Sequence, residues 1–265
     1  MNNRDLIVSY PGFFVSEFRD GALWLKISGN FFHNAISFDR MDFFHDYFAA
    51  LAEEKEIKTV VMHSGFSDSG SDEYLKFFLF ESPERDPGHF GFSNTMNRYE
   101  LHRYCNVIDQ TILDILAMDK MFIHICTGEV ISLFLNIALA CDYRIITSDT
   151  MFHNVYHEIG MLPKGGAPFI LGRTVGPGKA KELLLQDRIT ALQALENRIV
   201  EDVVVPEDLE DRVQEIICRF NDLPAQSLFG VKRLANFNFD ELKTYLEYET
   251  EQIWKIGQNK NFFDQ

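Results

Sequence analysis

The most constraining feature of the chain is a twelve-residue apolar run, Val130 to Cys141, which begins shortly after Gly128. The run is too short to cross a bilayer, which takes about 20 apolar residues, and too apolar for a surface helix. It therefore predicts a buried helix. What the N-terminus of that helix faces becomes the main question about function.

Short β-prone segments alternate with helical patterns along most of the chain. Strands are expected at residues 23–28, 58–63, 121–126, 143–147 and 200–205. Strands separated by helices are typical of a largely parallel α/β architecture with right-handed crossovers. Between the first two strands, Ser37 is the expected N-cap of an amphipathic helix. Its apolar positions are Met41, Phe44, Phe48 and Leu51.

The expected organisation is one core with helices attached at its C-terminal end. A chain of 265 residues with 46% hydrophobic content can bury a full core, and no Pro/Gly/Ser-rich linker or sharp repeat divides it. We expect residues 1–205 to form the core and residues 206–265 a helical region. That region would hold one amphipathic helix after Pro206 and two more helices within residues 224–262.

Charge, cysteine content and the N-terminus narrow the class of protein. A formal net charge of -15 argues against general nucleic-acid binding, which depends on clustered Lys and Arg. The four cysteines show neither a CxxC pair nor metal-ligand spacing, so reduced thiols are expected. The first residues lack the pattern of an export signal, and no membrane segment is indicated. A cytoplasmic location is the expectation.

Several landmarks follow the apolar run in a fixed order. They are Ala140, Cys141, Asp142, Phe152, Gly160 and Pro163. Further matches lie at Asn34 to Ser37, at Ser69 to Asp72 and at residues 180–200. Over roughly residues 20–235, this order resembles the crotonase superfamily of enoyl-CoA hydratases and isomerases. The resemblance implies a crotonase-like spiral of ββα units with C-terminal helices, which in that family pack across the interface of a trimer or hexamer.

The resemblance also implies a site for an acyl-CoA or related carbonyl substrate. Members of the family stabilise an enolate or oxyanion with two backbone amides, here those of Ser71 and Leu133. Fixed donors of this kind suit a developing negative charge in a water-poor site. No cofactor is implied beyond the coenzyme A of the substrate. Basic residues of Leu171 to Lys181, together with Lys164 and Lys232, are candidate contacts for its phosphates, and the alternative for any one of them is a solvated surface position.

The sequence departs from the family pattern at the positions that carry the chemistry. Ser132, Leu133 and Phe134 stand where relatives usually place glycines, so the helix start is displaced, the substrate lies differently or the hole is blocked. Asn136 and Tyr156 stand where hydratases carry two glutamates. Asn136 cannot exchange a proton but can orient water, whereas Tyr156 could act as an acid or hydrogen-bond donor.

Replacement groups lie beside Tyr156. His157 and Glu158, with His153, are the candidates for proton transfer, because histidine titrates near neutral pH and a carboxylate can fix its tautomer. The alternative is that these are polar loop residues facing solvent or a subunit contact. The expected substrate contacts are Asp72, Phe77, Phe134 and His153. No metal site is expected, since HNVYHE lacks the glutamate between two histidines that a zinc protease requires.

Three functions remain open. The first is a divergent crotonase-type enzyme that isomerises, hydrates, dehydrates or hydrolyses an acyl-CoA. The second is a CoA-independent hydrolase that cleaves carbon-carbon bonds in β-diketones with histidine and carboxylate groups. The third is a non-catalytic paralogue that binds a ligand or another chain, since fold alone does not establish a reaction.

Overall fold

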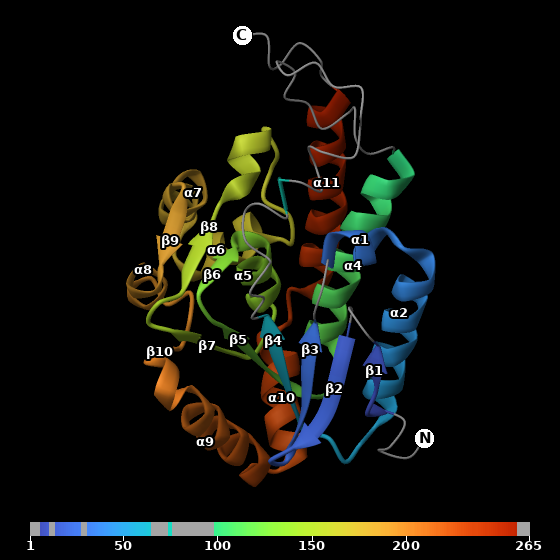
Figure 1. Cartoon of the computed structure of the whole chain (residues 1–265), viewed down its shortest axis with the longest axis vertical. Helices are drawn as coiled ribbons and strands as arrows, with labels where there is room; N and C mark the ends of the chain where they lie inside the picture. Colours follow the sequence, from blue (N-terminus) through green and yellow to red (C-terminus); the bar gives the residue numbers. More distant parts are fainter. Residues whose placement is uncertain (1–5, 11–13, 28–30, 65–73, 76–97, 259–265) are drawn as a thin grey trace.

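The computed structural model describes residues 6–10, 14–27, 31–64, 74–75 and 98–258. Its largest element is a seven-stranded sheet with the order β1-β2-β3-β4-β5-β7-β10 (Figure 1). The strands are β1 (Ser9–Tyr10), β2 (Phe14–Arg19), β3 (Ala22–Ile27), β4 (Thr59–Ser64), β5 (Met121–Cys126), β7 (Tyr143–Thr147) and β10 (Asp202–Val204). From β3 onward the neighbours pair in parallel, and β1 and β2 extend the sheet antiparallel. The five strands expected from the sequence are confirmed.

A smaller sheet has the order β6-β8-β9. Its strands are β6 (Glu129–Ile131), β8 (Met151–His153) and β9 (Arg188–Thr190). Consecutive strands divide between the two sheets, because β5 and β7 belong to the large sheet whereas β6 and β8 belong to the small one. The two consecutive segments β5-β6 and β7-β8 therefore each add one strand to each sheet, as in a spiral of ββα units.

The apolar run forms a shorter helix than its sequence predicts. Val130 and Ile131 pair with β8 as part of β6, and helix α5 (Ser132–Ala138) contains the next seven residues. Every residue of α5 is buried, which confirms the burial but not the length. The pairing of Val130 and Ile131 with Phe152 and His153 gives these amides sheet partners, so the helix begins only after the strand ends.

Helices on one side of the large sheet carry most of the main core. They are α1 (Phe31–Ile36), α2 (Phe38–Glu53), α4 (Arg98–Ala117) and the last helix, α11 (Phe239–Gln258), which lie side by side in Figure 1. Ser37 is the N-cap of α2, as expected, although its side chain makes no capping hydrogen bond. Tyr47, Phe48 and Leu51 are the buried residues of α2. Apolar residues of α4 and α11 belong to the same core cluster.

Short helices follow the small sheet. They are η3 (Val155–Ile159), α6 (Ala167–Thr174), α7 (Pro177–Leu185), α8 (Ala191–Glu196) and η4 (Pro206–Asp208). At the C-cap of η3, Gly160 has φ 62°, a left-handed conformation that glycine adopts without steric cost. This turn returns the chain toward α5 and brings Pro163 and the residues after it to the core.

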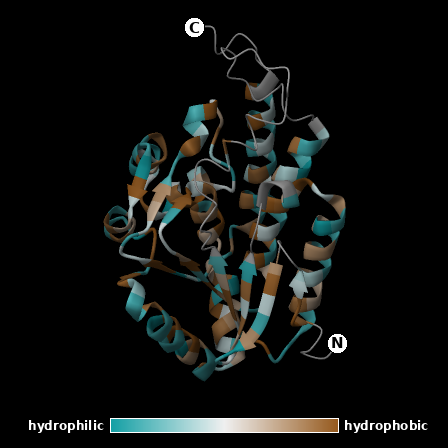
Figure 2. Ribbon diagram, viewed as in Figure 1, coloured by the Kyte–Doolittle hydropathy of each residue, from teal (hydrophilic) through white to brown (hydrophobic). Residues whose placement is uncertain are grey.

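The C-terminal region is helical, as expected. Helix α9 (Leu209–Asp222) packs Val213, Ile216 and Ile217 into a second apolar cluster on the other side of the large sheet. Helix α10 (Ala225–Ala235) precedes α11. Figure 2 shows hydrophilic residues along much of α9, whose buried residues are Val213, Ile216, Ile217 and Phe220. Because α11 belongs to the main core, a boundary at residue 205 separates segments of sequence but not independent cores.

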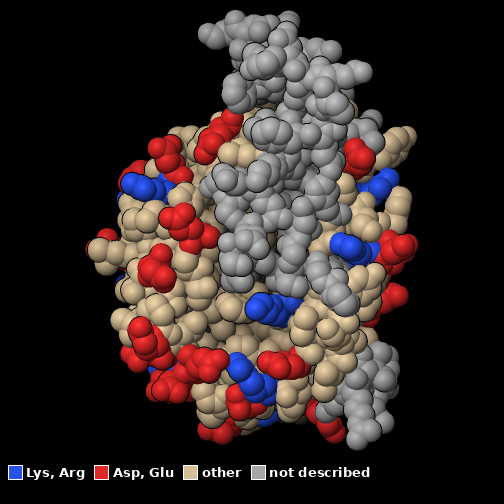
Figure 3. Space-filling model, in the orientation of Figure 1, with Lys and Arg blue, Asp and Glu red and all other residues tan. Residues whose placement is uncertain are grey.

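The negative net charge is visible on the surface. Acidic side chains gather over α9 on the face shown in Figure 3. Cys105, Cys126 and Cys141 are buried and Cys218 is exposed, all four as free thiols. Among the described helices, none combines the length and apolar character needed to span a membrane.

Candidate functional site

The start of α5 lies against a small cavity. Side chains from four segments line it: Tyr74, Ile131, Ser132, Leu133, Asn136, His153, Val155, Tyr156 and Lys164. The volume that the centre of a water molecule can occupy is about 10 Å³. This is about the space that one water molecule requires. Leu133 reaches this space, whereas Phe134 does not line it and is packed in the core. The first turn of α5 thus borders a small space lined by both apolar and polar residues.

Ser132 ties the start of α5 to the end of α7. Its hydroxyl donates to Oδ1 of Asn154, and Nδ2 of Asn154 donates to the carbonyls of Leu183 at 3.0 Å and Gln186 at 2.7 Å. These bonds satisfy two carbonyls at a helix C-terminus that have no intrahelical partner. The position of the first turn of α5 therefore depends on side-chain bonds, where relatives are expected to have glycine.

Asn136 lies one turn further along α5. Its Nδ2 donates to the carbonyl of Lys164 at 2.8 Å, and the residue is buried. Because a carbonyl can only accept, this bond identifies which end of the amide is nitrogen. Asn136 and Leu133 both border the cavity, which places the residue at the expected first-glutamate position beside the expected amide donor.

Tyr156 and His157 share one acceptor. The Tyr156 hydroxyl donates to the carbonyl of Leu184 at 2.7 Å, and His157 Nε2 lies 2.8 Å from the same oxygen. Burial raises the pKa of Tyr156 well above its usual value of 10.0, so the phenol stays protonated. His157 and Glu158 are exposed, and neither lines the cavity. Of Tyr156, His157 and Glu158, only Tyr156 therefore lines the cavity.

His153 is the histidine on the cavity wall. It lies on β8, and its Nε2 is buried without a hydrogen-bond partner within the described part of the chain. The nearest carboxylate is Glu129, whose Oε2 is 3.8 Å from Nε2 and whose side chain is 77% exposed. A buried ring nitrogen without a partner is costly unless a ligand or water meets it. His153 is therefore the group on this wall with unused hydrogen-bonding capacity.

Comparison with known proteins identifies the family. The family model for enoyl-CoA hydratase/isomerase matches residues 94–262. The chain belongs to this family. A probable enoyl-CoA hydratase of Mycobacterium tuberculosis, EchA17, is 29% identical over 139 residues, 52% of this chain and 53% of the relative. A crotonyl-CoA hydratase of Syntrophomonas wolfei is 37% identical over 104 residues, 39% of this chain and 40% of the relative. The chain thus matches about half the length of these curated relatives or less.

Solved structures confirm the crotonase-like fold. An enoyl-CoA hydratase from Bacillus halodurans superposes with a TM-score of 0.78 at 19% identity, covering 95% of this chain and 98% of that one. An enoyl-CoA hydratase from Mycobacterium avium subsp. paratuberculosis gives a TM-score of 0.68 at 21% identity, with coverages of 94% and 89%. At these identities the likeness concerns the fold, so the chemistry of this family member must be argued from its own residues.

A buried ion network behind the cavity was not predicted from the sequence. Lys164 Nζ lies 2.6 Å from Asp109 Oδ1 on α4 and 3.0 Å from Glu249 Oε2 on α11. Thr250 Oγ1 is also 3.0 Å from Nζ. Although burial favours the neutral amine, Glu249 and Asp109 outweigh it and raise the pKa of Lys164. Lys164 is 4% exposed, so it is not a solvated surface residue, and its ammonium group is engaged within the core instead of being free for CoA phosphates.

The predicted contact of Lys232 with CoA phosphates is corrected in the same way. The residue is 5% exposed, and its Nζ contacts Asp142 Oδ2 at 2.9 Å and the carbonyls of Ile115 and Lys120. A buried ammonium needs such acceptors because it has lost its hydration. Lys232 therefore holds α10 against the core and presents no charge to a ligand.

A sequence signal for Glu249 existed. On α11 the apolar positions Leu242, Leu246 and Ile253 recur at helical spacing, and Glu249 occupies the place in this stripe between Leu246 and Ile253. A charged residue in the buried stripe of a helix predicts a buried partner. The partner could not be read from the sequence, because it arises from a loop 85 residues away.

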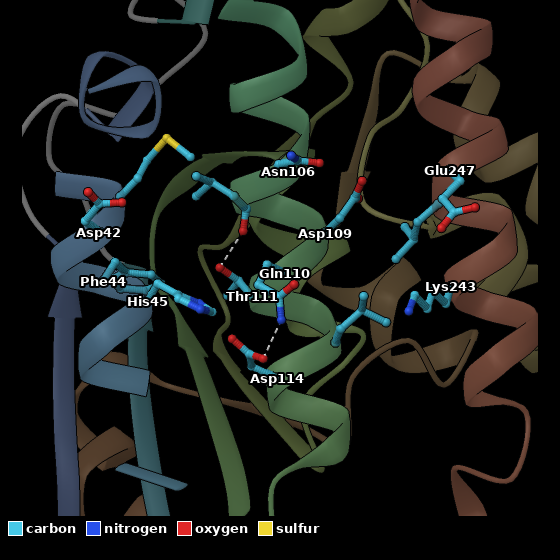
Figure 4. A pocket seen from close by; sticks show the side chains of 14 residues that line it. Asp42, Phe44, His45, Asn106, Asp109, Gln110, Thr111, Asp114, Lys243 and Glu247 are labelled. Atoms are coloured by element: carbon cyan, nitrogen blue, oxygen red, sulfur yellow. Dashed lines mark hydrogen bonds between the residues drawn. The ribbon is translucent and has the colours of Figure 1, made fainter. Parts of the chain in front are cut away.

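Asp109 connects the network to an open groove between α2, α4 and α11 (Figure 4). The groove has a volume of about 380 Å³ and is lined by apolar residues together with charged groups such as Asp42, His45, Asp114 and Lys243. In Figure 4, Asp109 points into the space between α4 and α11, where its carboxylate meets Lys164. The Asp109–Lys164 ion pair therefore lies between the groove and the small cavity.

Three predicted site residues, Ser71, Asp72 and Phe77, lie outside the described residues. Their roles stay predictions. Within the described ranges, no group of three or more His, Cys, Asp or Glu side chains could hold a metal ion.

Proposed function

We propose that the chain is a divergent acyl-CoA enzyme that stabilises an enolate or oxyanion with the backbone amides of Leu133 and Ser71. The observation that carries the proposal is the placement of the first turn of α5 against a small cavity lined by Asn136 and His153. Amides at the start of a helix have no intrahelical acceptor, and they are strongest as donors where water is excluded. A thioester carbonyl oxygen bound there would gain stabilisation as it became negative.

His153 supports a proton-transfer step at this site. An enolate forms when a base removes a proton next to the thioester carbonyl, and the electron pair moves onto the carbonyl oxygen. Tyr156 is held protonated, and Lys164 is engaged by two carboxylates. We propose that the imidazole of His153, whose Nε2 has no hydrogen-bond partner among the described residues, takes and returns this proton. We propose Asn136 as the residue that orients the substrate or a water molecule.

The proposal departs from the pair of glutamates used by hydratases. Asn136 and Tyr156 hold the matched positions, so a two-carboxylate hydration is not available to this chain. Proton movement between carbons of the acyl group, as in isomerisation, needs one base, and His153 can supply it. We therefore favour isomerisation or deprotonation chemistry over hydration, with coenzyme A as part of the substrate and no separate cofactor.

Calorimetry with a panel of acyl-CoAs tests the binding step. Crotonyl-CoA, benzoyl-CoA and free coenzyme A would be titrated into the full chain, and we expect saturable binding of at least one thioester. Absence of heat for every thioester at millimolar concentration would remove the proposal. Leu133 stands where relatives are expected to have glycine, and its side chain borders the cavity. Binding should therefore be repeated with Leu133→Ala, which enlarges the cavity.

A second candidate is supported by the His153 and Glu129 pair. A histidine with a nearby carboxylate is the arrangement expected for the superfamily's CoA-independent hydrolases of β-diketones. Turnover of a cyclic β-diketone by the wild type that is lost in His153→Gln would support this candidate. A third outcome, in which neither substrate class binds, would leave a non-catalytic partner subunit.

We also propose that the chain assembles as a homotrimer or hexamer in the cytoplasm. Apolar side chains remain exposed at and after the end of α10, where Val231 is 68%, Leu234 79% and Phe237 88% exposed. Burial of such side chains between copies would be favourable. Light scattering coupled to gel filtration gives the oligomer directly, and a monomer at micromolar concentration would contradict the assembly.

A further inference from the structure

One peptide bond joins the last helix to the candidate site. The peptide between Lys164 and Gly165 donates its N–H to Glu249 Oε2 at 2.9 Å, and its carbonyl accepts from Asn136 Nδ2 at 2.8 Å. Since the N–H and C=O of a trans peptide lie in its plane and point in opposite directions, Glu249 and Asn136 bond to opposite edges of one rigid planar unit. A movement of this plane would change both contacts together.

Glu249 fixes the plane through several bonds at once. Its Oε1 accepts from the Gly166 amide at 3.0 Å, and its Oε2 accepts from Lys164 Nζ at 3.0 Å as well as from Gly165. The carboxylate is therefore bound by two consecutive amides and an ammonium group while it is 4% exposed. Charge-assisted bonds of this kind are about twice as strong as neutral ones.

The two glycines fit the loop tightly between α5 and α11. Gly165 has φ +99°, and a Cβ there would lie 3.3 Å from the Asn136 Cβ. Gly166 has φ +71°, and a Cβ there would lie 3.0 Å from Leu242 Cδ1 on α11. The loop thus contacts the site residue on one side and the last helix on the other, with no room for the backbone to shift toward either.

We propose that Glu249 is a positioning residue for the candidate site, acting on Asn136 through the Lys164–Gly165 peptide. The carboxylate fixes the carbonyl of Lys164, the carbonyl captures Nδ2 of Asn136, and the amide of Asn136 is held in one orientation at the cavity wall. Glu249 does not line the cavity itself. Its effect on reaction rate rests on the proposed function, whereas its effect on the orientation of Asn136 does not.

Crystal structures of Glu249→Gln and of Glu251→Gln test the positioning directly. Glu251 lies on the same helix with a side chain that is 69% exposed, which makes it a matched control. The glutamine at 249 turns an amide NH₂ toward a donor, so we expect the Lys164–Gly165 peptide to rotate and the Asn136 bond to be lost. Lys164 keeps Asp109 as its counter-ion, which should preserve the fold. An unchanged Asn136–Lys164 bond in Glu249→Gln would overturn the proposal.

Isomerisation kinetics with 3-butenoyl-CoA, whose double bond can move into conjugation with the thioester, provide the second readout. We expect Glu249→Gln to lower kcat by about tenfold to a hundredfold with little change in KM, as misplacement of a site residue does. In an Asn136→Ala background the same change should have no further effect on kcat, whereas equal losses in both backgrounds would contradict action through Asn136. Glu249→Asp, which keeps the charge, should retain intermediate activity and serves if Glu249→Gln does not fold.

The crystal structures and the kinetics together distinguish failure of the positioning role from failure of the proposed function. If the wild type neither binds nor converts 3-butenoyl-CoA or the other thioesters, the proposed function fails, and the crystal structures alone decide the positioning role. If the wild type is active and Glu249→Gln retains both its rate and its Asn136 geometry, the positioning role fails and the proposed function stands.

Discussion

The ammonium group of Lys232 lies 2.9 Å from Oδ2 of Asp142, which also accepts the backbone N–H of Phe122 at 2.8 Å. One carboxylate thereby joins α10 to the first residues of β5 and to the turn before β7. The Lys232 side chain is 2% exposed and that of Asp142 13%, so the contact is protected from water. It explains why an aspartate follows Cys141: its role is to hold a helix to the sheet.

Removal of the Lys232 ammonium group should therefore destabilise the folded state. Lys232→Met leaves the Asp142 carboxylate buried without its partner, and we expect the free energy of unfolding to fall by about 3 to 5 kcal/mol. Urea denaturation followed by circular dichroism measures it. Lys243→Met, at an exposed position on α11, should change the same quantity by less than about 0.5 kcal/mol. Equal effects of the two substitutions would refute the anchoring role.

Deletion of one backbone donor tests the amide of Leu133. Leu133→Pro removes the N–H in the first turn of α5, where proline is best tolerated in a helix, while Leu133→Ala removes side-chain bulk and keeps the N–H. If this amide stabilises an oxyanion, the proline variant should turn over an accepted thioester about 100-fold to 1,000-fold more slowly than the alanine variant. Matching rates in two folded variants would show that the donor is not used.

The two histidines near the site should behave differently. His153→Gln removes the titratable group from the cavity wall, and we expect activity to fall by about 100-fold or more. His157→Gln keeps a donor for the Leu184 carbonyl on an exposed side chain, so activity should remain within about twofold. Steady-state rates across pH 5 to 9 measure both. A large loss confined to His157→Gln would instead favour proton transfer by His157, with Glu158 as its neighbouring carboxylate.

Asp109 should make the free energy of unfolding depend on pH. Burial raises the pKa of its carboxyl group from 3.8 to about 6, despite the nearby Lys164. The folded state then binds a proton that the unfolded state has released, so this residue's contribution to stability decreases as pH rises from about 4 to about 6 and is constant above. Relative to Asp109→Asn, the wild type should lose about 3 kcal/mol of unfolding free energy across that interval.

Urea denaturation at several pH values measures this difference. Asp211→Asn, at an exposed position on α9, is the matched control, and its difference from wild type should be nearly flat between pH 4 and pH 7. A wild-type curve parallel to that of Asp109→Asn would show that the Asp109 carboxyl group is not perturbed.

The sequence predicted the strands, the helix after Ser37 and the C-terminal helices because each depends on local periodicity. It overestimated the length of α5, since the pairing of Val130 and Ile131 with β8 is a long-range contact that apolar character alone cannot reveal. Asn136, Leu133 and His153 were found from the resemblance and do meet at one cavity. The Asp109, Lys164 and Glu249 network could not be predicted, because its members come together only after three separate segments have packed.

The shared acceptor of Tyr156 and His157 limits how this chain can change. At the position where relatives are expected to carry a glutamate, the phenol of Tyr156 donates to the end of α7. An ionised carboxylate introduced by Tyr156→Glu would meet the Leu184 carbonyl as a second acceptor, so the two oxygens would repel. This substitution would leave His157 as the remaining side-chain donor to that carbonyl. A glutamate at position 156 would therefore come at the cost of one bond that holds the last turn of α7.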